Sequence, residues 1–273
     1  MKMAKDQNLF DEYLLRLKNN DPNLTVIDLE NQDLTQDEIK LIATSIKTNT
    51  MIQKLKLSRN RILDTGAITL AAAIAENNSL LCIHLHSAGI GSTGAKSIAT
   101  ILELKTNLEA FSLSNNPIKA TGVIAIAIAF REHPKLKLLS LARCGMRDEG
   151  VQALATMLDT NSVLTTLEVS TNQISAIGMK YMAQHLNNHP SLKLLAIREN
   201  CMGYFFDEDQ FNVERFYTMP VSTSVNKPKP AGSSLLSWFW GSSKQQPITV
   251  PLLTQSFEDD KPAIAVKRLH IQC

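Results

Sequence analysis

The residues best suited to chemistry lie in the short run Cys82-Ile-His84-Leu-His86. In a strand this alternation would place the thiol and both imidazoles on one face, and these groups bind zinc in proteins. Cys82 and His86 would, however, lie about 13 Å apart along an extended strand, which is too far for one ion. We therefore predict no metal site here and no cofactor.

A serine beside a histidine is the other arrangement that could be reactive. Ser112 stands 28 residues after His84, and Lys56 stands 28 residues before it. A serine nucleophile needs a third group that orients its histidine, and a lysine has the wrong charge for that role. The chain also lacks the G-x-S-x-G turn of hydrolases and a phosphate-binding loop. We predict that the protein is not an enzyme.

The remaining candidates suit binding. Four cations stand close together at Lys54, Lys56, Arg59 and Arg61. The polar residues that follow at the same interval are His84, His86, Ser112, Ser114 and Arg143. A basic patch beside small polar residues predicts a surface for a protein partner with an acidic segment. Salt-bridged, solvated side chains, with Lys56 paired to Asp28, are the alternative.

These candidates belong to a pattern that returns every 28 residues. Its first apolar position is Leu24, Ile52, Leu80, Leu108, Leu136, Leu164 and Leu192. Each repeat begins with strand-like alternation, as in Leu55 and Leu57, and continues with apolar residues at helical spacing. A fixed period of this length predicts a solenoid, in which equivalent residues of neighbouring repeats lie side by side. We number the repeats one to seven.

Two further positions recur and predict how the turns are built. Glycine stands at Gly66, Gly94, Gly122, Gly150 and Gly178, and we expect close backbone approach or a positive φ there. Asparagine stands at Asn60, Asn116, Asn172 and Asn200, where its amide can bond buried backbone groups. Gln32, Ala88 and Cys144 replace it in the other repeats, so we expect a weaker ladder at Ala88.

The pattern LxxLxLxxNxI, followed by the glycine and an A-x-x-L helix, resembles the ribonuclease-inhibitor-like subfamily of leucine-rich repeats. The resemblance covers about residues 24–202. It implies an α/β horseshoe with a parallel sheet on the concave face and helices on the convex face. Concave faces of such proteins usually bind a partner, but the scaffold carries several functions and does not identify one.

The chain divides into four predicted parts. Residues 1–23 contain an apolar helical stripe and read as an N-terminal capping helix, a repeat zero. Residues 24–202 hold the seven repeats. Residues 203–265 are a C-terminal cap and an excursion rich in serine and proline, and residues 266–273 return to the LxxLxL pattern as a possible terminal strand.

Both tryptophans of the chain, Trp238 and Trp240, lie in the excursion. Their cluster could fold back on the open end of the solenoid, anchor a partner or enter a membrane interface. We expect it to fold back, and we keep both residues as candidate partner-binding residues.

Composition narrows the setting. The net charge is +2, no stretch of about 18 apolar residues is present, and the four cysteines show no paired spacing. We expect reduced thiols in a monomeric, intracellular and cytoplasmic protein without a membrane span.

The C-terminal run Glu258-Asp-Asp260, with the short apolar and basic end after it, resembles export signals of type IV-secreted bacterial effectors. That resemblance implies an effector that captures a host protein in the host cytosol. Two alternatives stay open. One is a GTPase regulator of the Ran GTPase-activating type, although the chain lacks the long acidic tail of that family. The other is an RNA or ribosome binder through the four cations of repeat two, which we consider unlikely because no aromatic residues are interleaved.

Overall fold

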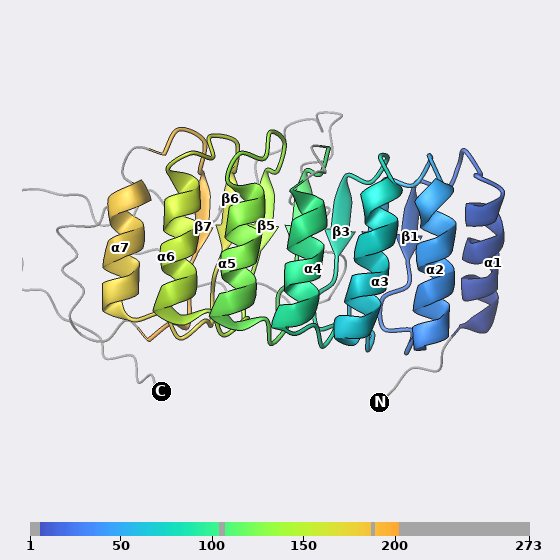
Figure 1. Cartoon of the computed structure of the whole chain (residues 1–273), viewed down its shortest axis with the longest axis horizontal. Helices are drawn as coiled ribbons and strands as arrows, with labels where there is room; N and C mark the ends of the chain where they lie inside the picture. The colour runs from blue at the N-terminus through green and yellow to red at the C-terminus, as the bar shows by residue number, and fades with distance from the viewer. Residues whose placement is uncertain (1–5, 104–106, 187–188, 202–273) are drawn as a thin grey trace, which may run out of the picture. The chain divides into compact units, whose positions relative to one another are not determined.

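The computed structural model describes residues 6–103, 107–186 and 189–201 of the chain. In these residues short strands alternate with helices (Figure 1). The helices are α1 (Gln7–Lys18), α2 (Gln36–Thr48), α3 (Leu63–Glu76), α4 (Ser92–Leu102), α5 (Lys119–Phe130), α6 (Arg147–Leu158) and α7 (Ala176–Leu186). The strands are β1 (Val26–Asp28), β2 (Lys54–Lys56), β3 (Cys82–His84), β4 (Ala110–Ser112), β5 (Leu138–Ser140), β6 (Thr166–Glu168) and β7 (Leu194–Ala196).

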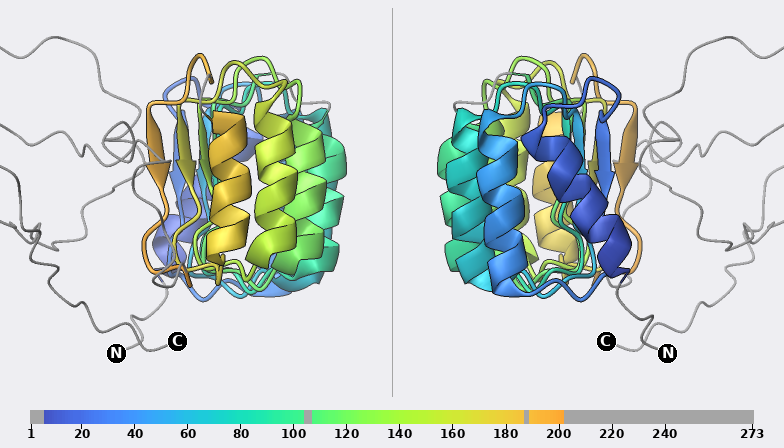
Figure 2. Two further views of the ribbon diagram at one scale, coloured as in Figure 1. Left: turned by 90° about the vertical axis from the view of Figure 1, so that its left-hand side faces the viewer. Right: turned by 90° about the vertical axis from the view of Figure 1, so that its right-hand side faces the viewer.

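The strands form one parallel sheet in the order β1 to β7, as predicted. Each residue pairs with the residue 28 positions later, for example Leu55 with Ile83 and His84 with Ser112. The helices form a second layer on one side of this sheet (Figure 2). This is the predicted α/β solenoid. We call the opposite side, which carries the outer strand residues, the sheet face.

The core lies between the two layers. The central residue of every strand points into it, and these residues, which run from Ile27 to Leu195, are at most 3% exposed. The recurring helix alanines, such as Ala71 and Ala99, are buried because a small side chain lets the helix approach the strands. In the middle of the stack Phe111 of β4 packs against Phe130 of α5, with ring centroids 5.8 Å apart.

The recurring glycines serve close packing. A Cβ on Gly94 would lie 2.7 Å from Oδ1 of Asp64 and 2.9 Å from Cβ of Ala67, both in the preceding repeat. The glycines with positive φ are instead Gly89 and Gly145, which stand earlier in the loops. Of the two roles expected for the recurring glycines, close approach is therefore the one that the fold uses.

The asparagine ladder is present. Oδ1 of Asn116 accepts hydrogen bonds from the backbone N–H groups of Ala88 (2.9 Å) and Ile90 (3.0 Å) in the preceding repeat. Its Nδ2 donates to the carbonyls of Leu85 and Leu113. Ala88 has no side-chain amide that could bond the backbone of the preceding repeat, so the side-chain ladder is interrupted there.

A second ladder at the other end of the repeats was not predicted. Asn49, Asn77 and Asn161 accept backbone N–H groups just before the next strand, and histidine takes the same place in two repeats. Nδ1 of His189 accepts the N–H of Leu192 (3.0 Å), while its Nε2 lies 2.6 Å from the carbonyl of Asn161. The imidazole therefore stands in for an amide.

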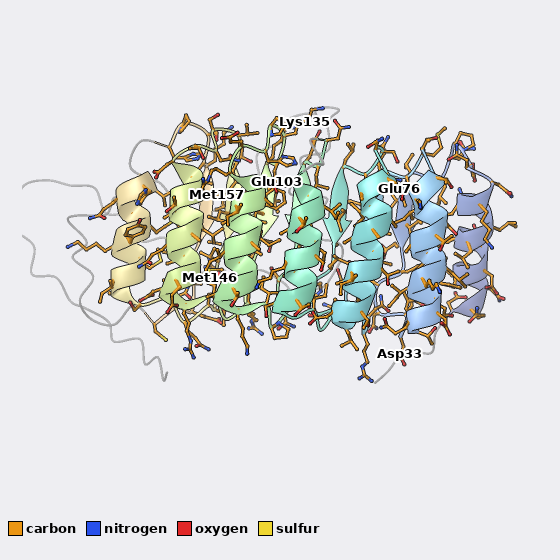
Figure 3. The ribbon with its side chains drawn as sticks, in the orientation of Figure 1. Asp33, Glu76, Glu103, Lys135, Met146 and Met157 are labelled. Atoms are coloured by element: carbon orange, nitrogen blue, oxygen red, sulfur yellow. The ribbon has the colours of Figure 1, made fainter. Side chains whose placement is uncertain are left out.

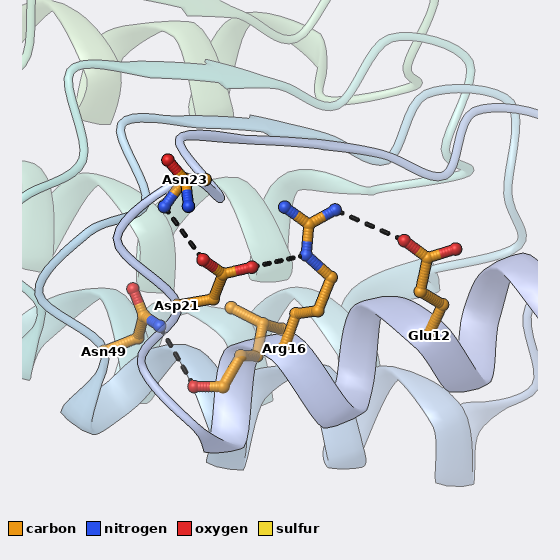
Figure 4. A network of polar contacts seen from close by, with 6 residues as sticks. Glu12, Arg16, Asp21, Asn23 and Asn49 are labelled. Atoms are coloured by element: carbon orange, nitrogen blue, oxygen red, sulfur yellow. Dashed lines mark hydrogen bonds and ion pairs between the residues drawn. The ribbon is translucent and has the colours of Figure 1, made fainter.

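The segment predicted as residues 1–23 contains α1, which packs on α2 through Phe10, Leu14 and Leu17. Nδ2 of Asn49 donates to the carbonyl of Leu17 at 3.0 Å (Figure 4). The same figure shows the Arg16 guanidinium between Asp21 (2.7 Å) and Glu12 (3.2 Å). The Asn49 bond holds the end of α1 against repeat one, and the Arg16 pairs fix the turn that follows α1.

The predicted cap and excursion of residues 203–265, the terminal strand of residues 266–273 and both tryptophans lie outside the described residues. Within the described part, no helix is long and apolar enough to cross a membrane.

Candidate binding surface

The register places the predicted site residues in rows across the sheet face. Lys54 lies beside Cys82, and Lys56 lies beside His84, which is followed by Ser112 on the next strand. Lys54, His84 and Ser112 are nevertheless buried, with 8%, 6% and 5% of their surface exposed. The open basic floor expected from the sequence is therefore only partly accessible.

Lys56 is already paired. Its Nζ lies 2.8 Å from Oδ2 of Asp28 on β1, which is the pairing considered as an alternative to a binding role. Burial alone would lower the pKa of Lys56, but the hydrogen bond and charge of Asp28 outweigh it and raise that pKa. The lysine therefore stays charged, and much of its charge is balanced within the fold.

Cys82 and His84 form a close pair, with Sγ 3.1 Å from Nε2. Burial raises the pKa of the Cys82 thiol to about 11. Burial, together with the charges of Lys54 and Lys56, lowers the pKa of His84 to about 4. Near neutral pH the pair is thus a thiol beside a neutral imidazole. Since the thiolate is the reactive form, this pair is a poor nucleophile.

The described residues hold no group of three histidine, cysteine or acidic side chains placed to bind a metal ion. Farther along the sheet the serines bond to one another and to an acid. Oγ of Ser114 lies 2.6 Å from Oγ of Ser140, and Ser140 donates to Glu168 on β6. These contacts give a polar floor of linked serine hydroxyls that ends at the carboxylate of Glu168.

Arg59, His86 and Arg143 lie where the strands lead into the loops. Nε of Arg59 donates to Nε2 of His86 (3.3 Å), and Ser87 lies 2.9 Å from Nδ1 of the same ring. Burial and the charge of Arg59 lower the pKa of His86. Arg59, Arg61 and Arg143 are exposed, so the accessible cations lie at this edge. We call the row of loops between strand ends and helix N-termini the loop edge.

Two residues of the loop edge were missed in the sequence, Lys119 and Arg147. Both are exposed and both begin a helix, α5 and α6. They occupy the same position in repeats four and five, so their 28-residue spacing is a periodic signal in the sequence. A search restricted to strand positions does not detect this signal.

Comparison with known proteins identifies the repeat. A family model described as Leucine Rich repeat matches residues 48–71, 76–99, 105–127, 132–155 and 160–183. Human leiomodin-1 is 32% identical over 81 residues, which is 29% of this chain and 14% of that protein. Rat leiomodin-1 is 31% identical over the same length. The chain thus matches about a seventh of the length of these relatives.

Two solved structures are also similar. One, titled leiomodin-1 actin-binding site 2, has a TM-score of 0.45 at 21% identity and covers 66% of this chain and 88% of that one. The other, the tropomodulin C-terminal domain of Caenorhabditis elegans, has a TM-score of 0.49 at 16% identity and covers 55% and 92%.

Proposed function

We propose that this leucine-rich-repeat solenoid is a non-enzymatic module that captures a protein partner on its sheet face and loop edge. The observation that carries this proposal is the row of polar side chains across the strands, beside which the exposed arginines of the loop edge lie. Solenoids present extended surfaces of this kind to macromolecules. The proposal includes a monomer that binds an acidic segment of its partner in the cytoplasm.

Capture from cell lysate by the tagged full-length protein tests the proposal. The site variant carries Lys56→Gln and Arg59→Glu; glutamine is used at Lys56 because a carboxylate there would be repelled by Asp28. A control variant carries Lys40→Gln and Lys96→Glu, at exposed positions on α2 and α4. We expect the site variant to bind a captured partner with a lower association rate, and the difference to shrink at high salt.

The competing site is the tryptophan cluster. If Trp238→Ala with Trp240→Ala abolishes capture while the Lys56 and Arg59 changes leave it intact, the proposed surface is wrong. If the two charge variants lose binding equally, the effect is one of net charge and the surface is wrong as well.

A second candidate partner comes from the relatives. The 81-residue match with leiomodin-1 makes actin the first named protein to test, since part of that protein is described as an actin-binding site. Co-sedimentation with actin filaments and anisotropy with labelled monomeric actin would detect it. No binding in either assay would remove actin from consideration and leave partner capture to the lysate experiment.

The biological setting is a separate proposal. The acidic run at Glu258–Asp260 supports export as a bacterial effector that acts on a host protein, and a translocation reporter fused to the C-terminal segment tests it. A GTPase-activation assay tests the Ran-type alternative. The salt dependence of RNA binding tests the nucleic-acid alternative.

A further inference from the structure

Five exposed cations lie along the loop edge of repeats two to five: Arg59, Arg61, Lys119, Arg143 and Arg147. Helices α3 to α6 begin at the same edge, so their N-terminal dipoles add to the positive potential. Asp64 and Asp148 also lie here, but their carboxylates accept backbone N–H groups of the next repeat, at Gly91 (2.6 Å) and Ser175 (2.8 Å).

These cations are poorly neutralised. Arg59 donates to His86 and Arg147 to Gln173, both uncharged partners. Within the described residues no ion pair involves Arg61 or Lys119. Only Arg143 faces an acid, Glu199, at 3.8 Å with both side chains more than half exposed.

The opposite edge, where helices end and strands begin, is different. Glu76 and Glu103 lie at this edge, whereas Asp33 lies at the loop edge on the opposite side of the repeats (Figure 3). Charges at that edge are paired between neighbouring repeats, as in Lys47–Glu76 (2.7 Å) and Lys137–Glu109 (3.1 Å). Lys135 at that edge donates to the uncharged Asn107, but exposed acids such as Glu103 and Glu132 lie near it.

Four of the five cations also occupy left-handed backbone positions. The φ angles are 59° at Arg59, 58° at Lys119, 54° at Arg143 and 52° at Arg147. Glycine or asparagine adopts this conformation more easily than a long side chain. Equivalent loop positions do carry asparagine, as at Asn31 and Asn115. The fold requires the conformation but not a cation, so the charges point to a role outside the fold.

We propose that the loop edge of repeats two to five binds an extended acidic segment of a partner protein. This inference rests on the proposed capture of a protein and locates the acidic contact at the loop edge, away from the sheet floor where Lys56 is paired. Arg61 and Arg147 stand three repeats apart, which is about 15 Å at the strand spacing and up to about 30 Å at the helix spacing. An extended segment spans this distance with roughly five to nine residues. Arginine forks suit the carboxylates of such a segment.

A protein segment fits better than nucleic acid. The described phenylalanine and tyrosine residues lie in helices and in β4, and none lies on the loop edge, where stacking on bases would need them. Glu149 and Glu199 interrupt the row of cations, which suits carboxylates spaced along a segment better than a continuous row of phosphates.

Fluorescence anisotropy with a labelled peptide of alternating glutamate and serine, about ten residues long, tests the site in the full-length chain. The loop-edge variant carries Arg61→Gln, Lys119→Asn and Arg147→Asn; asparagine favours the left-handed positions, so the variant should remain folded. The matched helix-face variant removes the same charge through Lys40→Gln, Lys96→Gln and Lys180→Gln, all at exposed positions. An oligouridine of equal charge is the second probe.

We expect the loop-edge variant to bind the peptide about tenfold more weakly and the helix-face variant to bind within about twofold of the unaltered chain. No peptide binding by the unaltered chain, equal losses in both variants, or tighter binding of the oligouridine than of the peptide would overturn the inference. If the loop-edge variant still captures the lysate partner while Lys56→Gln alone abolishes capture, this site is wrong and the proposed function stands. If no partner is captured at all, the proposed function fails by itself.

Discussion

At the scale of single residues, burial decides what Cys82 and His84 can do. Strand alternation correctly placed both side chains on the sheet face, because a strand reverses its side chains at every residue. Their exposure was not predictable in the same way, since it depends on the neighbours that surround them. The result is a neutral, close pair in place of two solvated, titratable groups.

The neutral state of His84 predicts that acid destabilises the protein. Its pKa is about 4 in the fold, against 6.5 for an ordinary histidine, mainly because of burial. Between these pH values the unfolded chain binds a proton that the folded chain does not. The free energy of unfolding should therefore fall as the pH decreases from 6.5 toward 4, by at most about 3 kcal/mol from this residue.

Urea unfolding at a series of pH values measures this effect. The His84→Gln variant should lose less stability than the unaltered protein over the same range, because glutamine does not titrate. The same loss in both proteins would show that His84 does not contribute to the acid sensitivity.

At the scale of elements, each loop takes its conformation from the next repeat. Where the next repeat carries an asparagine at the ladder position, the Oδ1 of that asparagine accepts two backbone N–H groups of the loop. Asn116 does this for Ala88 and Ile90. Where Ala88 or Cys144 follows, the loop turns differently. The N–H of Leu63 donates to the carbonyl of Ala88, that of Lys119 donates to the carbonyl of Cys144, and both donors take a positive φ. Arg147 makes the same bond to the carbonyl of Asn172 with a positive φ, so the loop before Asn172 combines both arrangements.

This dependence explains which parts of the fold could be predicted. The period of 28 residues predicted the strands, the helices and the register, because those follow from hydrophobic spacing within one repeat. The backbone at Lys119 and Arg147 depends on bonds to another repeat, which spacing does not reveal. The left-handed backbone at these positions was not predictable for that reason, whereas the two cations recur 28 residues apart and could have been found in the sequence.

Asp64 illustrates a contact between elements that can be tested by mutation. Its Oδ1 accepts the N–H groups of Gly91 and Gly94 at the start of α4, a helix whose own N-cap residue is glycine and makes no side-chain bond. We expect Asp64→Ala to lower the free energy of unfolding by about 1–2 kcal/mol, the typical loss for an N-cap.

Asp37 provides the control for this change. It also lies in the first turn of a helix, α2, but α2 is capped by its own Thr35. Asp37→Ala should therefore cost only a few tenths of a kcal/mol, through the helix dipole. Equal losses for the two variants in denaturant titrations would argue against capping of α4 by the preceding repeat.

At the scale of the whole molecule, the described repeats contact mainly their neighbours. Helix α1 packs on α2, and each later helix packs on the next. Because the main contacts of the described helices and strands join neighbouring repeats, damage at one end should stay near that end. A solenoid of this kind differs from a globular domain, in which one core residue supports every element.

We expect Leu17→Ala to loosen the first repeats selectively. Leu17 is 2% exposed, and its removal leaves a cavity under α1 that should cost about 2–4 kcal/mol locally. Hydrogen exchange should accelerate at β1 and α2, while the amides of β5 and α6 should keep their protection. A uniform acceleration through all repeats would show instead that the stack unfolds as one unit.

Because each loop depends on the ladder residue of the next repeat, the structural unit of the solenoid is larger than one repeat. Asn60, Ala88, Asn116 and Cys144 alternate, and the loops before them alternate in the same order, so repeats one to five behave as pairs. Removal of a single repeat from this region would place a loop that is built for an asparagine before a repeat that lacks one, or the reverse. Removal of two consecutive repeats would preserve every match. We expect shortened or lengthened forms of this chain to be tolerated best when repeats are lost or gained two at a time.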